Sequence, residues 1–450
     1  MSIRGDLLMP APTHATQFPG GAVSSYLLPI TMGIDWGTSF TKVVLRTAGR
    51  AFAVRFDDAA LGIDAFLLPS LLHLDDRGRA FHRRRSGGQN LGGLKMELFR
   101  LADTGESADE NGALAVVYLA GVIRRARTWF LREQAATFRS CRLRWSINLG
   151  MPAEDFGNES LVERLFTIVQ AAWHLSTQPG PLRVETARYV WRDVVTGHAL
   201  PGLDCEQVDV LPEIAAQVVG YSHETRARSG LRVLMDIGAM TVDLAGFALF
   251  DPEGAERFAC YGTQVSHFGV QNLHRNRIRY LLSALEGKPL ENETFVRLQM
   301  AMRKMEDPGQ PVPRSVRPYL SGQLRTLVSA PEHPDGDMAE RCRQALHAQL
   351  SMLWKQKAMH QRSWKEGLPI FMCGGGCTLP VYQQAVREVS DRWRAFAGVG
   401  AFRLFTLAPP ADLDAPRLAP AYYHRLSVAY GLSYPAEEIS ALQIARPEPV

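Results

Sequence analysis

Apolar runs that end at polar turns predict strands in two separate parts of the chain. Met32 to Leu45, MGIDWGTSFTKVVL, is an apolar run that ends on an aspartate, passes a glycine and hydroxyl residues, and becomes apolar again. Leu231 to Gly262, LRVLMDIGAMTVDLAGFALFDPEGAERFACYG, follows the same order of strand, Asp-x-Gly turn, strand, turn and strand. The two segments lie roughly 200 residues apart, and this self-similarity predicts one architecture used twice.

Helical periodicity occupies much of the chain between and after these strands. Apolar residues recur at helical spacing from Gly112 to Gln134 and from Glu159 to Leu175. Between them, LRWSINLGMP (Leu143 to Pro152) predicts a buried strand that ends in a proline loop. Further helices are expected from Leu273 to Met305 and around Asp337 to Gln361. The chain therefore reads as an α/β protein.

Composition narrows the class of protein. Hydrophobic residues make up 46% of the 450 residues and charged residues 21%, which is typical of a globular protein. The net charge of +4 argues against a dedicated nucleic-acid binder. No apolar run reaches the roughly 18 residues of a membrane-spanning helix, and the start of the chain lacks a signal-peptide core. The six scattered cysteines favour a reducing compartment, so we expect a cytoplasmic protein.

The first hairpin carries the residues of an anion site. Glycine at position 37 lets an anion approach the backbone closely, the hydroxyls of Thr38, Ser39 and Thr41 add donors, and Lys42 adds a positive charge. The carboxylate of Asp35 would repel a phosphate unless a cation lay between them. Magnesium is usually held in this way, by one or two carboxylates together with phosphate oxygens.

The second hairpin repeats this pattern with Asp236, Gly238, Thr241 and Asp243. Two such hairpins that face each other across a cleft would hold the phosphates of a nucleotide from both sides. A third glycine turn, at residues 374–376, would admit a ribose or base close to the backbone. Each turn taken alone is also typical of an ordinary loop, so the prediction depends on their order and spacing.

A water-activating group is also expected at a nucleotide site. Glu213 follows a proline in DVLPEIAAQVVGY, just before the second pair of strands. Its carboxylate could orient or deprotonate an attacking water. An exposed start of a helix is the alternative interpretation of the same residue.

Five motifs together resemble those of the actin-like ATPases, the superfamily of actin, the sugar kinases and the DnaK-type heat-shock chaperones. GIDWGTSFTK resembles the first phosphate motif, LMDIGAMTVD the second, and PIFMCGGGCTLP the adenosine motif. LPEIAAQVVGY and SVAYG resemble the two connecting segments. The resemblance covers about residues 32–435 and implies two ribonuclease-H-like lobes with a nucleotide cleft between them.

The domain boundaries implied by this resemblance divide the chain into four parts. They are a flexible leader over 1–28, lobe I over 29–210, lobe II over 211–435 with a helical subdomain at about 273–365, and a tail over 436–450.

The resemblance also implies roles for individual residues, with ATP or ADP and Mg²⁺ as cofactors. Asp35 and Asp236 would hold magnesium largely through water. The catalytic group would comprise Asp35, Lys95, Glu213, Asp236 and Asp243. The nucleotide would contact Gly37, Thr38, Ser39, Lys42, Gly238, Ala239, Thr241, Gly269, Lys304, Gly374 and Gly375.

Several features depart from any single branch of the superfamily. Lys42 is typical of actin and the bacterial filament ATPases, whereas Lys95 is placed as in the chaperones. Ala239 and Met240 stand where the chaperones carry glycines, which would narrow the phosphate site and slow hydrolysis. No peptide-binding domain of the chaperone type is recognisable after SVAYG.

Three functions fit these motifs. The first is a magnesium-dependent ATPase that acts as a conformational switch and engages a protein partner. The second is a filament-forming or scaffold protein of the bacterial actin type, with slow hydrolysis. The third is a small-molecule kinase, which is disfavoured because no acceptor-activating aspartate stands out. Partner contacts are expected at the arginine-rich segment 81–90 and the proline-rich segment 306–318, each of which could equally be a solvated loop or spacer.

Overall fold

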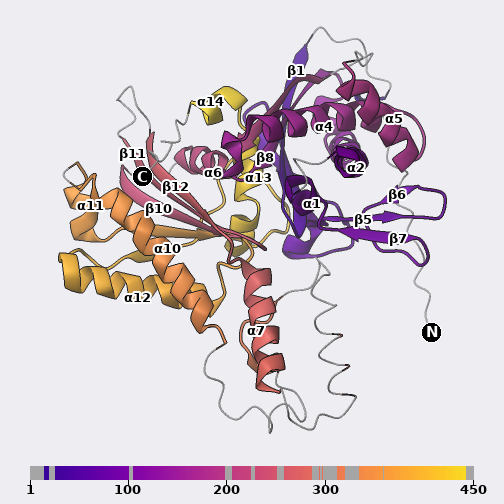
Figure 1. The fold of residues 1–450 in the computed structure, drawn as a ribbon. Helices are drawn as coiled ribbons and strands as arrows, with labels where there is room; N and C mark the ends of the chain where they lie inside the picture. The colour runs from indigo at the N-terminus through magenta and orange to yellow at the C-terminus, as the bar shows by residue number, and fades with distance from the viewer. Residues whose placement is uncertain are drawn as a thin grey trace.

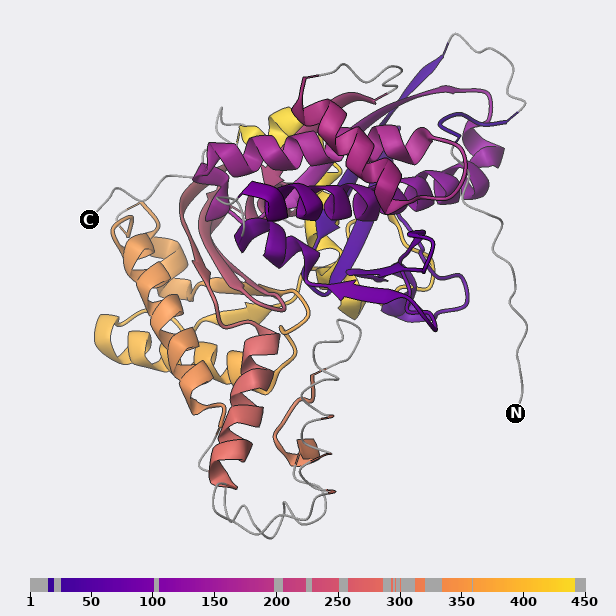
Figure 2. The same ribbon diagram turned by 45° about the vertical axis from the view of Figure 1, so that its right-hand side comes forward.

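The computed structural model describes residues 15–19, 26–100, 105–197, 205–223, 229–250, 258–285, 293, 296, 300, 312–319, 334–357 and 359–441. Over these residues the protein is a mixed α/β structure with two large sheets and one small one (Figure 1). Helices cover the large sheets on their outer sides, as the turned view in Figure 2 also shows.

The first sheet has seven strands, six of them in the order β15-β3-β2-β1-β8-β9, with β4 paired to β2 outside this path. Strand β2 pairs antiparallel with both β1 and β3, whereas β8 runs parallel to β1, β9 parallel to β8, and β15 parallel to β3. These strands are β1 (Leu27–Trp36), β2 (Phe40–Thr47), β3 (Arg50–Ala53), β4 (Leu68–Pro69), β8 (Arg142–Met151), β9 (Cys205–Pro212) and β15 (Leu413–Asp414).

The second sheet repeats this arrangement with five strands in the order β12-β11-β10-β13-β14. Again the first three strands are antiparallel, and β13 and β14 run parallel to β10 and to each other. The strands are β10 (Gly230–Ile237), β11 (Val242–Leu249), β12 (Phe258–Ser266), β13 (Pro369–Cys373) and β14 (Arg403–Phe405). The repeated architecture predicted from the two Asp-x-Gly segments is therefore present in the strand pairing.

Helices form separate apolar cores with the two sheets. The first sheet packs with α2, α4 and α5, and its core includes Trp145 and Trp173. The second sheet packs with α10 and α12, and its core includes Trp364 and Trp393. The helices named here are α2 (Gly105–Glu133), α4 (Glu159–Thr177), α5 (Val184–Val195), α10 (Gly336–Trp354) and α12 (Pro380–Ala397).

Two short helices cross at close range between the sheets, and they carry the segments predicted as connectors. They are α6 (Glu213–Ser222) and α13 (Ser427–Leu432). A side-chain carbon at Gly431 would overlap the carbonyl of Ala216, and one at Gly33 in β1 would overlap the carbonyl of Ala429. Glycine at these two positions lets α13 lie directly on both α6 and the first sheet.

The remaining elements are short. A small sheet has the order β6-β5-β7, with strands β5 (Leu71–Leu74), β6 (Ala80–Phe81) and β7 (Gln89–Gly92). The other helices are α1 (Leu94–Arg100), α3 (Ala135–Phe138), α7 (Val270–Ala284), α11 (Gln361–Glu366) and α14 (Ala436–Ser440). Single 3-10 turns are η1 (Gly62–Phe66), η2 (Asp155–Gly157), η3 (Arg317–Tyr319) and η4 (Pro420–Arg425).

Both ends of the described chain return to the first sheet. The side chain of Gln17 bonds the backbone N–H and carbonyl of Leu143 at 2.8 and 2.9 Å, and Phe18 is buried beside it. Residues 15–19, expected in a flexible leader, are therefore packed on β8. Near the C-terminus, β15 pairs with β3, so part of the range expected for lobe II adds a strand to the first sheet.

The described residues test only some of the other sequence predictions. Most of the leader, much of the segment 273–305, expected to be helical, and most of the tail lie outside them. Among the residues that are described, no helix combines the length and the apolar character that crossing a lipid bilayer requires.

Candidate functional site

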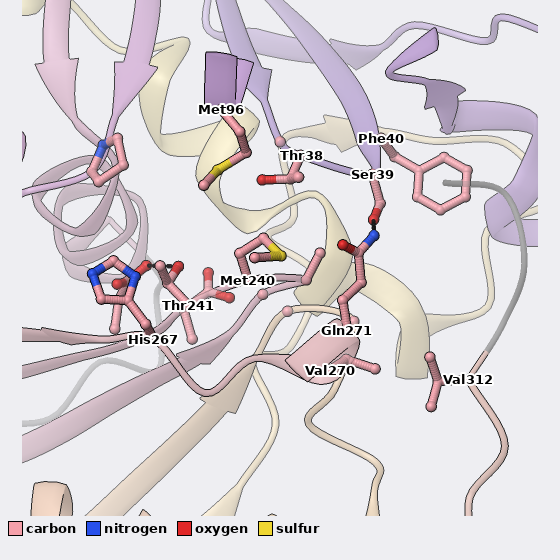
Figure 3. A pocket seen from close by; sticks show the side chains of 18 of the residues that line it. Thr38, Ser39, Phe40, Met96, Met240, Thr241, His267, Val270, Gln271 and Val312 are labelled. Atoms are coloured by element: carbon pink, nitrogen blue, oxygen red, sulfur yellow. Dashed lines mark hydrogen bonds between the residues drawn. The ribbon is translucent and has the colours of Figure 1, made fainter. Parts of the chain in front are cut away.

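The tips of both Asp-x-Gly hairpins line one cavity of about 980 Å³. The third glycine turn, one face of α1, one face of α7 along most of its length, and the end of η4 also line it. Figure 3 shows the cavity from close by, with Thr38 and Ser39 on one side and Met240 and Thr241 on the other. The residues predicted from two distant segments of the chain are thus brought together.

The first hairpin holds a buried ion pair. Asp35 in β1 faces Lys42 in β2 in the register of the sheet, and their side chains meet at 2.6 Å from Nζ to Oδ2. A side-chain carbon at Gly37 would lie 2.7 Å from the carbonyl oxygen of Phe40, so this turn is too tight for any residue but glycine. Lys42 is therefore fixed at the mouth of the turn by a carboxylate.

Thr41 does not belong to the anion site. Its side chain is fully buried, and its hydroxyl bonds the Tyr118 hydroxyl at 2.7 Å and the Ser70 hydroxyl at 3.3 Å. The expectation that it would donate into the cavity is wrong, because side chains alternate along β2 and Thr41 points to the core side. Thr38 and Ser39, in the turn itself, do line the cavity.

The second hairpin places two carboxylates opposite each other. Asp236 in β10 faces Asp243 in β11, and the amide of Gln217 in α6 donates to Asp236 Oδ2 at 2.5 Å. Burial raises the pKa of Asp236 to about 7, and the nearby charge of Asp35 adds to this. Burial, followed by the charge of Asp236, raises the pKa of Asp243 well above its usual range.

One oxygen of Asp243 has no hydrogen-bond partner among the described residues. Oδ1 is buried, whereas Oδ2 accepts from the Thr241 hydroxyl at 3.4 Å. The side-chain oxygen of Gln217, one turn into α6, is also buried without a partner in the described part of the chain. These two buried acceptors, one on the second hairpin and one on α6, are available to accept hydrogen bonds from water or from metal-bound water.

The third glycine turn is closely packed against the second hairpin. β13 runs beside β10 with Cys373 level with Asp236, and Gly374 follows with φ of +75°. A side-chain carbon at Gly374 would overlap Oδ1 of Asp236, and one at Gly376 would overlap the Ile237 side chain. The glycines therefore bring the backbone of this turn directly against the carboxylate.

A second ion pair lies on the opposite wall. Nζ of Lys95 in α1 meets Oε1 of Glu213, the first residue of α6, at 2.8 Å. Only 9% of the Lys95 side chain and 19% of the Glu213 side chain are exposed, and both line the cavity. The pair joins a segment after the small sheet to the connecting helix α6.

Two contacts span the cavity between the sheets. The Gln271 amide in α7 donates to the Ser39 hydroxyl at 3.2 Å, drawn as a dashed line in Figure 3. His267 Nε2 and Glu154 Oε2 approach to 4.0 Å on exposed side chains. The turn of the first hairpin is therefore in contact with α7 across the cavity.

Not every predicted residue reaches the cavity. Gly269 packs against the backbone of Ala239 and Met240, and its N–H donates to the Met240 carbonyl at 2.9 Å, so it supports the second turn instead of lining the cavity. Ala239 does line it. Lys304 lies outside the described residues.

Several residues in or behind the cavity wall escaped the sequence analysis. Gln217 lies one turn after Glu213 on α6, and a helical reading of PEIAAQ could have placed it on the same face. Gln271 and Arg425 gave no signal, because single polar residues in a helix or a loop are typical of any surface.

No protein-family model matches this chain, and no curated protein shows significant similarity to it. What this site does must therefore be argued from its own geometry.

Proposed function

We propose that the chain is an ATP-binding protein of the actin-like ATPase type, in which two ribonuclease-H-like lobes close on a magnesium–nucleotide complex and a protein partner reads the change. The observation that carries the proposal is the pair Asp35 and Asp236. They hold equivalent positions in two like-built hairpins and line one cavity together with Gly374.

The residues at this site fit a hydrated magnesium ion better than a directly ligated metal. Among the described residues, no group of three or more histidine, cysteine, aspartate or glutamate side chains is arranged to hold a metal. Magnesium keeps several waters and needs only one or two carboxylates beside phosphate oxygens. Asp35 and Asp236 supply those carboxylates, and the unpartnered oxygen of Asp243 can accept from a metal-bound water.

The cavity also suits a nucleotide in size and charge. Its volume of about 980 Å³ lies within the usual range for small-molecule sites. Lys42 and the turn hydroxyls of Thr38 and Ser39 face it from the first hairpin. The magnesium ion would neutralise charge on the phosphates.

Glu213 is the residue that we assign to water positioning. Lys95 holds its carboxylate at 2.8 Å, so the side chain has a fixed orientation beside the second hairpin. A carboxylate placed in this way can accept a proton or hydrogen bond from an attacking water. Hydrolysis would be slow if Met240, which lines the cavity from the second turn, excludes that water.

Closure would act through the crossing of α6 and α13. A ligand that bridges both hairpins binds the closed arrangement more tightly than an open one. This difference in affinity shifts the population toward the closed arrangement. The contact of Gln271 with Ser39 at 3.2 Å is the kind of contact that would break on opening.

Nucleotide-dependent thermal unfolding tests the proposal. ATP with magnesium should raise the unfolding temperature of the wild type by mass action, and much less so for Asp35→Ala and Asp236→Ala. Asp76→Ala, in the exposed turn between β5 and β6, is the control and should respond like the wild type. Equal shifts in all four proteins, or none in the wild type, would contradict the proposal.

A filament-forming scaffold is the second candidate. It is favoured by Lys42, which the resemblance associates with actin and the bacterial filament ATPases, and by Met240 at the cavity wall. Electron microscopy with ATP separates the two, because filaments support the scaffold and discrete particles support the switch.

A further inference from the structure

Arg425 ends the η4 turn and reaches the cavity from a segment that none of the motifs covers. Its guanidinium carbon lies 3.5 Å from where a side-chain carbon would stand at Gly375. It also lies 5.8 Å from the centre of the Phe40 ring in the first hairpin. The guanidinium is thus held between the third glycine turn and the first hairpin.

Most other cations at this cavity are engaged by partners. Lys42 is paired with Asp35 and Lys95 with Glu213. Arg314 donates to the Thr378 carbonyl at 3.0 Å, and Arg279 donates to Asn276 at 3.1 Å, both in exposed positions. Their hydrogen-bonding capacity is therefore in part used by the protein itself.

Arg425 differs, because its guanidinium donates no hydrogen bond and forms no ion pair within the described part of the chain. Asp35, Asp64 and Asp236 act on it only through space. Burial lowers the pKa of Arg425, which means that its charge has lost water without gaining a bonded counter-ion. Arg275 in α7 also lines the cavity and has no hydrogen-bond or ion-pair partner among the described residues, but it is exposed to water.

An unpaired guanidinium in a partly desolvated cavity is a strong site for a phosphate group. Its planar set of donors matches two phosphate oxygens at once, and such charge-assisted bonds are stronger than neutral ones. Gly375 leaves the space beside the guanidinium without a side chain, since a side-chain carbon there would stand 3.5 Å from the guanidinium carbon. The chemistry at Arg425 therefore favours a phosphate over a neutral sugar or base.

We propose that Arg425 binds the phosphate chain of the nucleotide directly, so that part of the nucleotide affinity persists without a divalent cation. This inference rests on the proposed function for the identity of the ligand, but the phosphate contact itself can be tested separately. Without a metal ion, we expect Lys42 and Lys95 to contribute less than Arg425 to phosphate binding, because a carboxylate already neutralises each of them.

Calorimetric binding of ADP, in magnesium and in excess EDTA, tests the inference on the full chain. The variants are Arg425→Gln, Arg425→Lys and the control Arg275→Gln, which removes the same charge from an exposed position of the same cavity. In EDTA we expect wild type and Arg275→Gln to keep measurable affinity and Arg425→Gln to lose about tenfold or more. Arg425→Lys should fall between, because a lysine keeps the charge and loses the paired donors.

Pyrophosphate with EDTA provides the second arm and needs no base or ribose. Wild type should bind it, and Arg425→Gln should not, with matching unfolding temperatures showing that both are folded. Equal losses in Arg425→Gln and Arg275→Gln, or equal binding by wild type and Arg425→Gln, would overturn the inference. Pyrophosphate binding that depends on Arg425 in a chain that binds neither ADP nor ATP would instead contradict the proposed function alone.

Discussion

Asp35 and Asp236 occupy equivalent positions in two hairpins. In each hairpin the aspartate belongs to the second-to-last pair of facing residues before the turn. The partner of Asp35 is Lys42, whereas the partner of Asp236 is Asp243. The backbone of the two hairpins is therefore equivalent and their charge is not. The first hairpin neutralises its own carboxylate with Lys42. In the second hairpin, burial and then the charge of Asp236 raise the pKa of Asp243.

Lys42→Met tests the ion pair of the first hairpin. In the wild type, Nζ of Lys42 lies 2.6 Å from the buried carboxylate of Asp35. The substitution leaves that carboxylate without a counter-charge. We expect the free energy of unfolding to fall by about 2 kcal/mol, because an unpaired buried charge is costly. Urea denaturation at neutral pH measures this.

Lys355→Met, on an exposed lysine after α10, is the matched control. It should change stability by less than about 0.5 kcal/mol. If both variants lose the same free energy of unfolding, the ion pair between Lys42 and Asp35 makes no specific contribution to stability.

Gly374→Ala tests the close approach of the third turn to the second hairpin. Gly374 has a φ of +75°, and its new methyl group would overlap Oδ1 of Asp236. Gly398→Ala has nearly the same backbone conformation, with φ of +65°, but its methyl group would meet open space. The control therefore isolates backbone strain, which costs about 1 kcal/mol.

We expect Gly374→Ala to cost about 1–3 kcal/mol more than Gly398→Ala, since overpacking adds to the strain. It should also abolish the thermal stabilisation by magnesium–ATP, which Gly398→Ala should retain. Similar unfolding midpoints and ATP responses in the two variants would show that Asp236 can move aside.

The local chemistry of the site was predictable from sequence because it is encoded within short segments. Asp35, Gly37 and Lys42 lie within one hairpin, and a hairpin of known register fixes which side chains meet. The repeat then predicted Asp236 without further information. Thr41 shows the limit of such local predictions. The alternation of side chains along β2 determines where the Thr41 side chain points, and the series of hydroxyl residues in the sequence does not.

The long-range partners were not predictable for a physical reason. Glu213 meets Lys95, and Gln217 meets Asp236, only because β9 delivers the start of α6 between the sheets. That placement depends on tertiary packing, about which residue spacing carries no information. Arg425 is the extreme case, since its neighbours are a glycine turn and a ring far away in the chain.

Gly431→Ala tests the crossing of the two connecting helices. The methyl group would overlap the carbonyl of Ala216 in α6, so the helices would have to separate. We expect a loss of about 1–3 kcal/mol in the free energy of unfolding and a weaker response to magnesium–ATP. Gly336→Ala, at the start of α10 with open space around it, should be neutral or slightly stabilising. Equal unfolding midpoints would mean that α6 and α13 are not tightly packed.

His82 should make the protein less stable in mild acid. It is buried, with Nε2 at 2.9 Å from the Tyr118 carbonyl. Burial lowers its pKa from 6.5 to about 3, and the charge of Arg125 adds to this. Between those two values the unfolded chain binds a proton that the folded chain does not, so stability falls as pH falls. His274 and His424, each with a pKa lowered to about 4 mainly by burial, act in the same direction.

His82→Asn removes one of these three proton-binding side chains and keeps an N–H donor for the Tyr118 carbonyl. The variant should be less stable at pH 7, because a smaller side chain leaves space in the core. Its loss of stability between pH 6 and pH 4 should be shallower than that of wild type by up to about 1.4 kcal/mol per pH unit. His267→Asn, on a side chain that is 71% exposed, should leave the slope unchanged. Parallel pH profiles for wild type and His82→Asn would mean that His82 is protonated in the folded protein, which its burial and the nearby charge of Arg125 oppose.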